Sequence, residues 1–267
     1  MYLTRRVALN GVWLDDVDSR IVISGIESGD GKESISATDA ASGYGQRITG
    51  NRRSTLDVAV KFRLLEHGKD VTGLQARAEL LEIVNAWAAN GGYLTLNYKP
   101  DRRLSVILAQ APGEGALWDF TKEFTMTFRA YGVPYWEQEM ARTASTGGGS
   151  NTSSATIVVE GSAPTQVDVR LQNTSGQKIS YANVMVDDKT MYFNELNLGA
   201  GETLVIDHND GLLRIRIQEN GGAYRSAMAL RHTDSANDYM VAPGARAVYF
   251  TAQRACRMTA SWRARYL

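Results

Sequence analysis

Apolar and polar residues alternate strictly over positions 56–64 of the chain. The apolar positions are Leu56, Val58, Val60, Phe62 and Leu64, with polar or small residues between them. Because a strand turns every second side chain to the same face, this pattern predicts a half-buried antiparallel strand. A similar alternation at 124–130 predicts a second strand, which ends before Pro134 because proline has no N–H to donate to a ladder.

Helical spacing is clear over one segment, residues 72–90. Its apolar residues recur three or four positions apart, at Leu74, Ala78, Leu81, Val84 and Ala88. Thr72 and Gln75 fit a capping box, and Gly91 with Gly92 supplies a left-handed stop. We predict one helix here, packed on a β-rich domain.

Two turn-rich segments precede this helix. Asn10 and Gly11 both tolerate positive φ, so they predict a tight hairpin between short strands. Residues 28–54 hold many Gly, Ser, Asp and Arg and show little apolar periodicity. We expect this stretch to form a long loop or an extended hairpin arm.

The middle of the chain, residues 141–155, is rich in Gly, Ser and Thr and has no large apolar residue. This composition is typical of a flexible linker, with a domain boundary nearer Glu137 as the alternative. Short apolar runs separated by turn residues follow it, which predicts a β-sandwich. We therefore expect a mainly β protein with a first domain at 1–140, a linker at 141–155 and a second domain at 156–267.

Composition narrows the classes of function. Lys+Arg and Asp+Glu number 29 each, so the formal net charge is zero, which argues against a general nucleic-acid binder. Cys256 is the single cysteine, so no intramolecular disulfide forms. The segment after Arg6 is too short and too polar for a secretory signal, and no apolar run approaches the ~20 residues that span a bilayer. We expect a soluble protein.

Motifs that carry chemistry are weak throughout. Residues 29–34 lack the first glycine of a phosphate loop and the Ser or Thr directly after its lysine. His67, His208 and His232 stand far apart, so a zinc site would need carboxylates from distant loops. Cys256 falls in an expected strand, where a packed thiol is commoner than a reactive one.

The acidic residues of the second half also favour structural roles, although two of them could in principle pair as glycosidase acid and base. Asp187 and Asp188 fit a polar turn between strands, Glu195 belongs to the same group, and Asp207 leads into the turn at 209–211. No Gly-x-Ser-x-Gly elbow is present. We therefore expect no catalytic, cofactor-binding or metal-binding residue.

Surface contacts are the remaining kind of site. Arg52 and Arg53 form a basic doublet that faces a partner's carboxylates or only water. Tyr135 and Trp136 cap the core of the first domain or join a subunit interface, where Tyr and Trp are enriched, and the two roles are compatible. The interface candidates are Arg47, Arg52, Arg53, Tyr135 and Trp136.

The order of these features resembles the distal tail protein (Dit) family of long-tailed, non-contractile phages. The similar segments are Leu9 to Gly11, Arg47 to Leu64, the helix at 72–90, Pro100 to Ala109, Thr127 to Trp136, Leu198 to Asp207 and Val241 to Gly244. They cover nearly the whole chain and rest on order and spacing rather than on one signature. Val133 departs from the pattern, since the family often has an acidic residue before Pro-Tyr-Trp.

The resemblance implies a structural virion protein without catalysis or cofactor. Its first domain would be a β-sandwich belt with one helix and a hairpin arm, and its second a galectin-like β-sandwich. Six copies would form a ring that joins the tail tube protein to a tail-associated protein and to receptor-binding proteins. The ring would lie at the tail tip of the virion after assembly in the host bacterial cytoplasm. DNA would pass through it without specific binding, and no membrane contact is implied.

Two other classes of function remain open. A carbohydrate-binding adhesin would bind host wall sugars through its second domain, by stacking a sugar on a tryptophan. Trp262, the single tryptophan after residue 155, alternates with Met258 and Ala260, which favours a place in the core. A hydrolase is the third class, and no motif supports it.

Overall fold

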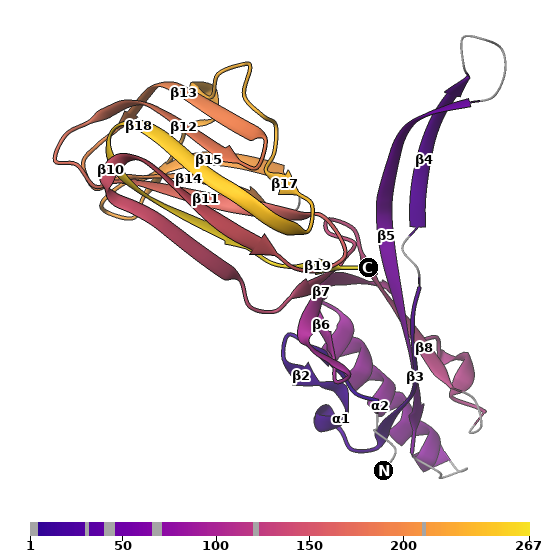
Figure 1. The fold of residues 1–267 in the computed structure, drawn as a ribbon. Helices are drawn as coiled ribbons and strands as arrows, with labels where there is room; N and C mark the ends of the chain where they lie inside the picture. The colour runs from indigo at the N-terminus through magenta and orange to yellow at the C-terminus, as the bar shows by residue number, and fades with distance from the viewer. Residues whose placement is uncertain (1–4, 30–31, 40–45, 66–70, 120–122, 210–211) are drawn as a thin grey trace. The chain divides into compact units, whose positions relative to one another are not determined.

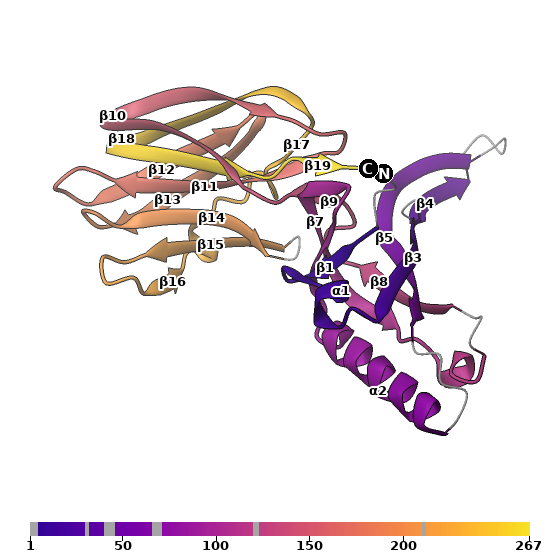
Figure 2. The ribbon, with the colours of Figure 1, turned by 90° about the horizontal axis from the view of Figure 1, so that it is seen from below.

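The computed structural model divides into two compact units (Figure 1, Figure 2). The first comprises Met1–Trp136 with Leu267, and the second comprises Glu137–Tyr266. The structure describes residues 5–29, 32–39, 46–65, 71–119, 123–209 and 212–267, and of residues 32–39, 46–54 and 116 it describes the backbone alone. Strands dominate both units, so the prediction of a mainly β fold is confirmed.

The first unit combines short and very long strands with one long helix. Its elements are β1 (Val7–Leu9), β2 (Val12–Trp13), α1 (Leu14–Val17), β3 (Ile21–Ser28), β4 (Lys32–Asp39), β5 (Gln46–Leu64), α2 (Val71–Ala88), β6 (Gly92–Leu96), β7 (Lys99–Gln110), the 3₁₀ helix η1 (Glu114–Ala116) and β8 (Phe124–Ala130).

The strands of the first unit follow one antiparallel path, β2-β1-β6-β7-β8-β5-β3. Strand β7 joins its two halves, because residues 92–106 hold the β6–β7 pairing and Ile107 to Gln110 pair with β8. Alternate side chains are buried on each half, for example Leu94 on β6 and Phe128 on β8. The two strands predicted from alternation, at 56–64 and 124–130, are both present.

Helix α2 packs against β8 and β2. The Trp87 ring meets the Phe128 ring edge-on at 6.0 Å between centroids, and Trp87 Nε1 donates to the Val12 carbonyl at 3.0 Å. The helix spans Val71–Ala88, so the prediction of 72–90 holds to within two residues, with Thr72 inside the first turn rather than before it. Three residues of the predicted stripe, Leu81, Val84 and Ala88, are buried, and Leu74 and Ala78 are half-buried. The remaining buried positions are Gly73, Arg77 and Leu80.

The predicted hairpin at Asn10-Gly11 is also present. Strands β1 and β2 pair around it, with φ of 53° at Asn10 and 81° at Gly11. The Asn10 side chain donates to the Gly91 carbonyl at 3.0 Å and accepts from the Tyr93 N–H at 2.9 Å. The Asn10 side chain therefore also holds in place the loop that follows α2.

The second unit is almost entirely strand. Its elements are β9 (Trp136–Gln138, whose first residue belongs to the first unit), β10 (Arg142–Val159), β11 (Thr165–Asn173), β12 (Ile179–Val186), β13 (Lys189–Leu198), β14 (Thr203–Asn209), β15 (Leu212–Gln218), β16 (Tyr224–Ser226), η2 (Met228–Leu230), β17 (Met240–Val241), β18 (Gly244–Trp262) and β19 (Arg265–Tyr266).

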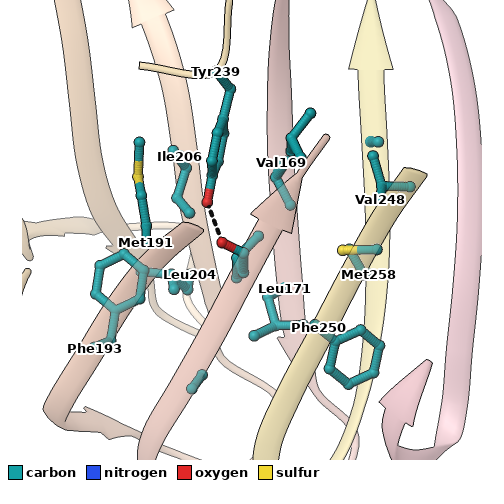
Figure 3. Packing of buried hydrophobic residues seen from close by; sticks show 14 of the residues in the cluster. Val169, Leu171, Met191, Phe193, Leu204, Ile206, Tyr239, Val248, Phe250 and Met258 are labelled. Atoms are coloured by element: carbon teal, nitrogen blue, oxygen red, sulfur yellow. Dashed lines mark hydrogen bonds between the residues drawn. The ribbon is translucent and has the colours of Figure 1, made fainter. Parts of the chain in front are cut away.

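One long strand, β18, joins the two halves of the second unit. Its first part, 248–252, pairs with β12, and its last part, 256–262, pairs with β11, in the order β13-β12-β18-β11-β14-β15-β16. Side chains from both halves meet in one buried cluster (Figure 3). Tyr239 lies within it and donates its hydroxyl to the Val184 carbonyl at 2.6 Å. A strand that passes from one half of a β-sandwich to the other forms a corner, and bends or bulges allow it to do so.

The prediction of a flexible linker at 141–155 was wrong. These residues lie almost wholly in β10, which pairs with β18 from Arg142–Trp262 to Val159–Gly244. The register breaks between Gly147 and Thr152, beside the corner of β18. Gly147 has φ of 88°, and a Cβ there would lie 2.5 Å from the Cys256 carbonyl oxygen. The glycines thus serve a β-bulge, where such φ values are needed.

Candidate assembly interface

The clearest projecting element is the hairpin of β4 with the first part of β5. It pairs from Lys32–Thr55 to Asp39–Gln46, while residues 56–64 of β5 pair with β3 and β8. Figure 1 shows this hairpin continuing beyond β3 and β8. Of the two alternatives for residues 28–54, the extended hairpin arm is the one observed. A two-stranded hairpin is marginally stable by itself, so this arm gains from a further strand or surface.

The three arginine candidates all lie on this arm. Arg47 stands opposite Thr38, Arg52 opposite Ser34 and Arg53 opposite Glu33 in the β4–β5 register. Their side chains are outside the part that the structure describes. Their role in an interface stays a prediction.

The two aromatic candidates differ in burial. Trp136 is 1% exposed, and the Lys99 ammonium lies 4.8 Å from its ring centroid. Tyr135 is half-buried. Within the single chain Trp136 therefore packs in the core, which is one of the two roles expected from the sequence. A contact with another subunit stays a prediction for both residues.

Charged side chains on β3, β8 and residues 56–64 of β5 are paired across strands. Arg129 donates to Asp57, with Nη2 to Oδ2 at 2.7 Å, and this hydrogen bond raises the pKa of Arg129. Lys61 pairs with Glu27. Exposed pairs of this kind add little stability, but they leave this part of the surface without excess charge.

Cys256 has no features of a reactive thiol. The side chain is fully buried in the core of the second unit, and burial raises its pKa to about 12. Because the thiolate is the nucleophile and the metal ligand, this thiol is inert in the folded chain. The prediction of a packed cysteine is confirmed.

Three of the residues considered for chemistry, His208, Asp187 and Asp207, are held in separate local pairs. His208 Nδ1 lies 3.0 Å from Asp168, Asp187 pairs with Arg246 at 3.2 Å, and Asp207 accepts from Arg214 Nε at 3.0 Å. His67 lies outside the described residues. Within the described ranges, no group of three His, Cys, Asp or Glu side chains could hold a metal ion.

Asp187 occupies the turn between β12 and β13, with φ of 59°. That placement confirms the polar turn expected from the sequence.

A surface hollow of about 690 Å³ lies in the second unit beside the bulge of β10. Its lining is polar and contains no aromatic side chain: Gly149, Ser150, Asn151, Ser175, Gly176, Gln177, Gln253, Arg254 and Ala255. Trp262 is 6% exposed and belongs to the core, as predicted. The tryptophan that an adhesin would use for stacking is therefore not available on the surface of this unit.

One exposed aromatic residue was not identified as an interface candidate from the sequence. Trp118, in the segment between β7 and β8, is 76% exposed. Nothing in the local pattern marked it, because Trp118 belongs to no periodic run and exposure is set by the tertiary fold.

Among the helices of the described chain, none is both long and apolar enough to cross a membrane.

No protein-family model and no curated protein matches the chain. Among solved structures, the chain is similar to the Dit protein of phage SPP1, described as a paradigm of the hub adsorption apparatus in phages that infect Gram-positive hosts. The TM-score is 0.68 and the identity 13%, over 99% of this chain and 100% of that one.

Chains of the phage P2 baseplate in its activated conformation, with Ca and with Sr, give TM-scores of 0.45 and 0.44 at 8% identity. They cover 98% and 97% of both chains. The likeness to SPP1 Dit spans both units, the arm and the helix, and it agrees with the resemblance seen in the sequence. The chain therefore has the fold of a phage distal tail protein, Dit.

Proposed function

We propose that the chain is a structural virion protein that forms the hub of a phage tail tip. Six copies form a ring that connects the tail tube protein to the tail-associated protein and to receptor-binding proteins. The observation that carries this proposal is the likeness over the whole chain to SPP1 Dit, a hub protein by its description. The ring lies in the tail tip of the virion and is assembled in the cytoplasm of the host bacterium.

The arm supports a ring of identical subunits. Strand β3 pairs with β5, and no second partner of β3 is found in the described part of the chain. An open strand edge accepts a further strand from another chain. Each copy thus offers both a projecting β4–β5 arm and an edge, which is what a repeating contact around a ring requires.

The same chain has no features of an enzyme in its described residues. Asp187 and Asp207 are held in ion pairs, and the candidate thiol is buried, which raises its pKa. We infer that the protein has no catalytic activity and needs no cofactor.

Electrostatics support passage of DNA through the ring without specific binding. The net charge is zero, and on β3, β8 and residues 56–64 of β5 Lys61 pairs with Glu27 and Arg129 with Asp57. Non-specific DNA binding needs an excess of Lys and Arg to displace counterions.

The test is deletion of residues 30–48, which removes most of the arm and leaves Leu56–Leu64 for the core. We expect the wild-type chain to assemble into rings and the deletion to remain a folded monomer, measured by sedimentation velocity and thermal unfolding. A second variant keeps the arm but replaces Arg47, Arg52 and Arg53 by Ala, and we expect weakened assembly. If the deleted chain formed rings as abundantly as wild type does, the arm would not be needed for assembly, and its proposed role would be wrong.

A further inference from the structure

The corner of β18 lies beside the polar hollow of about 690 Å³ in the second unit. The walls of this hollow come from the bulge of β10 at 149–151, the loop at 175–177 and residues 253–255 of β18. The last of these lie between the part of β18 that pairs with β12 and the part that pairs with β11. Sites for small ligands have volumes of roughly 300–1,000 Å³, so the hollow has room for more than a single ion.

Hydrogen bonds tie the three walls together. Thr174 donates its hydroxyl to the Gly148 carbonyl at 3.0 Å and its N–H to the Ala255 carbonyl at 3.1 Å. Asn173 is fully buried, and its side chain donates to the Gln177 carbonyl at 2.8 Å. The walls are thus positioned before a ligand arrives, which lowers the entropic cost of binding.

Two arginines at this hollow have no partner of their own. Arg254 lines it, and the Arg257 guanidinium lies beside Gly148, where a Cβ would be 3.4 Å from Arg257 Nη2. Both residues are exposed, and neither makes a hydrogen bond or ion pair to a described residue. Every other arginine of the second unit donates a hydrogen bond to a described residue. Free guanidinium groups are therefore confined to this corner of the described unit.

The charge around these arginines favours an anion. Among the described residues that line the hollow, none is acidic. Glu202, whose carbonyl accepts from the Asn173 N–H, has its carboxylate paired with Arg225 at 2.8 Å. An arginine binds a carboxylate or a phosphate through two N–H groups at once, so two free guanidinium groups suit a ligand of this charge.

The rest of the lining offers hydrogen bonds to hydroxyl groups. Asn151, Gln177 and Gln253 carry side-chain amides, each with a donor and an acceptor. The Gln253 carbonyl oxygen accepts from the N–H and the hydroxyl of Ser180, at 2.9 and 2.8 Å, so the amide is fixed and its NH₂ group remains to donate. Ala255 is the one apolar side chain of the described lining, so the hollow offers little to the apolar side chains of a peptide.

We propose that this hollow binds an acidic saccharide, that is, a sugar that carries a phosphate or a carboxylate group. Arg254 and Arg257 bind the anionic group, while Asn151, Gln177 and Gln253 hydrogen-bond the sugar hydroxyls. Recognition depends on charge and hydrogen bonds and not on stacking against a tryptophan. The inference goes beyond the hub function, because it gives the second unit a ligand of its own, and it does not depend on the ring.

The first test measures the binding of small probes to the full chain by isothermal titration calorimetry. The probes are glucose, glucose 6-phosphate, glucuronate, inorganic phosphate and a triglutamate peptide. We expect at least one of the two acidic sugars to bind at least about tenfold more tightly than glucose, inorganic phosphate and the peptide. A hydrogen bond to a charged group is strong enough to give a difference of this size.

The second test repeats the titration with variants of the full chain. Arg254→Gln and Arg257→Gln should each weaken binding of the acidic sugar at least about tenfold. Gln253→Glu keeps an oxygen for Ser180 but places a negative charge in the hollow, so it should weaken binding further. The matched control is Arg142→Gln, since Arg142 is 40% exposed and paired with Glu160, and this variant should bind as wild type does. Thermal unfolding checks that each variant is folded.

Acidic sugars that bind no more tightly than glucose, or that bind Arg254→Gln as well as wild type, overturn the inference. Inorganic phosphate that binds as tightly as the acidic sugars shows an anion site alone. A triglutamate peptide that binds more tightly than both sugars shows an acidic protein segment as the occupant. Either of these results also overturns the saccharide. All of these outcomes leave the proposed ring standing, because the ring is tested by the mass of the assembled chain.

Discussion

Gly147 shows how one residue determines the course of the longest strand pair. Its φ of 88° and the 2.5 Å approach of the Cys256 carbonyl leave no room for a Cβ. Backbone strain of this kind costs on the order of 1–3 kcal/mol. The residue is therefore required by the bulge and is not a sign of flexibility.

We expect Gly147→Ala to lower the free energy of unfolding of the second unit by about 2 kcal/mol or more. Gly149, two positions on, has nothing within 4 Å of a Cβ placed there, so Gly149→Ala is the matched control and should change stability little. Urea unfolding of the two variants measures the difference. Equal stabilities would show that the bulge does not constrain the backbone.

Tyr239 is the buried polar residue whose pH dependence is most informative. Burial raises its pKa well above the ordinary value of 10.0, and its hydroxyl donates to the Val184 carbonyl. A group whose folded pKa is raised stabilises the fold fully below its unfolded pKa, and that stability is lost as the pH rises above it.

We expect Tyr239→Phe to cost about 1–3 kcal/mol at pH 7, since it leaves a buried carbonyl without this donor. Above pH 10 wild type should lose stability faster than the Phe variant, so the gap narrows. Tyr224→Phe, at a position 46% exposed, is the control and should give no such pattern. Guanidinium unfolding at pH 7, 9 and 11 provides the measurement, and a gap that widens with pH would refute the assignment.

At the scale of elements, β10 decides where the second unit begins. It pairs with β18 along both halves, so residues 142–155 complete the sheet at its outer edge. We expect a fragment of residues 137–267 to unfold cooperatively and a fragment of residues 156–267 to lack a cooperative transition. Circular dichroism melts of the two fragments are the measurement. A sharp transition in the shorter fragment would show that residues 142–155 are not needed for the fold, as the sequence-based prediction of a linker implies.

The elements also show why some of the fold was predictable. Strands at 56–64 and 124–130 have one buried face, so their apolar alternation is visible in the sequence. Strand β10 has no such face over much of its length, because exposed and half-buried Ser, Thr and Gly alternate there. Composition therefore favoured a linker, and only pairing with β18 reveals the strand.

Helix α2 shows a smaller limit of prediction from the sequence. The spacing of Leu81, Val84 and Ala88 gave the helix and part of its buried face. Arg77 was not expected on that face, because an arginine is buried only where the tertiary fold supplies contacts, here with the Phe124 ring at 5.8 Å. The pattern of residue types does not contain that information.

The candidate interface was predictable to a similar extent. The lack of apolar periodicity in 28–54 indicated a long loop or a hairpin arm, since a hairpin that leaves the core has no buried face to mark it. Trp118 was not predictable, because its exposure depends on how the segment after β7 packs.

At the scale of the whole molecule, the fold is shared with SPP1 Dit at 13% identity. Alternation of burial, turn residues and strand lengths can be satisfied by many sequences, so topology persists after identity is lost. Function does not follow from fold alone, and the hub role therefore depends on showing that copies of this chain assemble.

The most direct measurement is the mass of the purified full-length chain by multi-angle light scattering, with negative-stain images of the same fraction. Six copies of the 29.3 kDa chain give about 176 kDa, and we predict that mass together with ring-shaped particles of sixfold symmetry. A single species of 29.3 kDa at every concentration, or closed particles of another symmetry, would contradict the account.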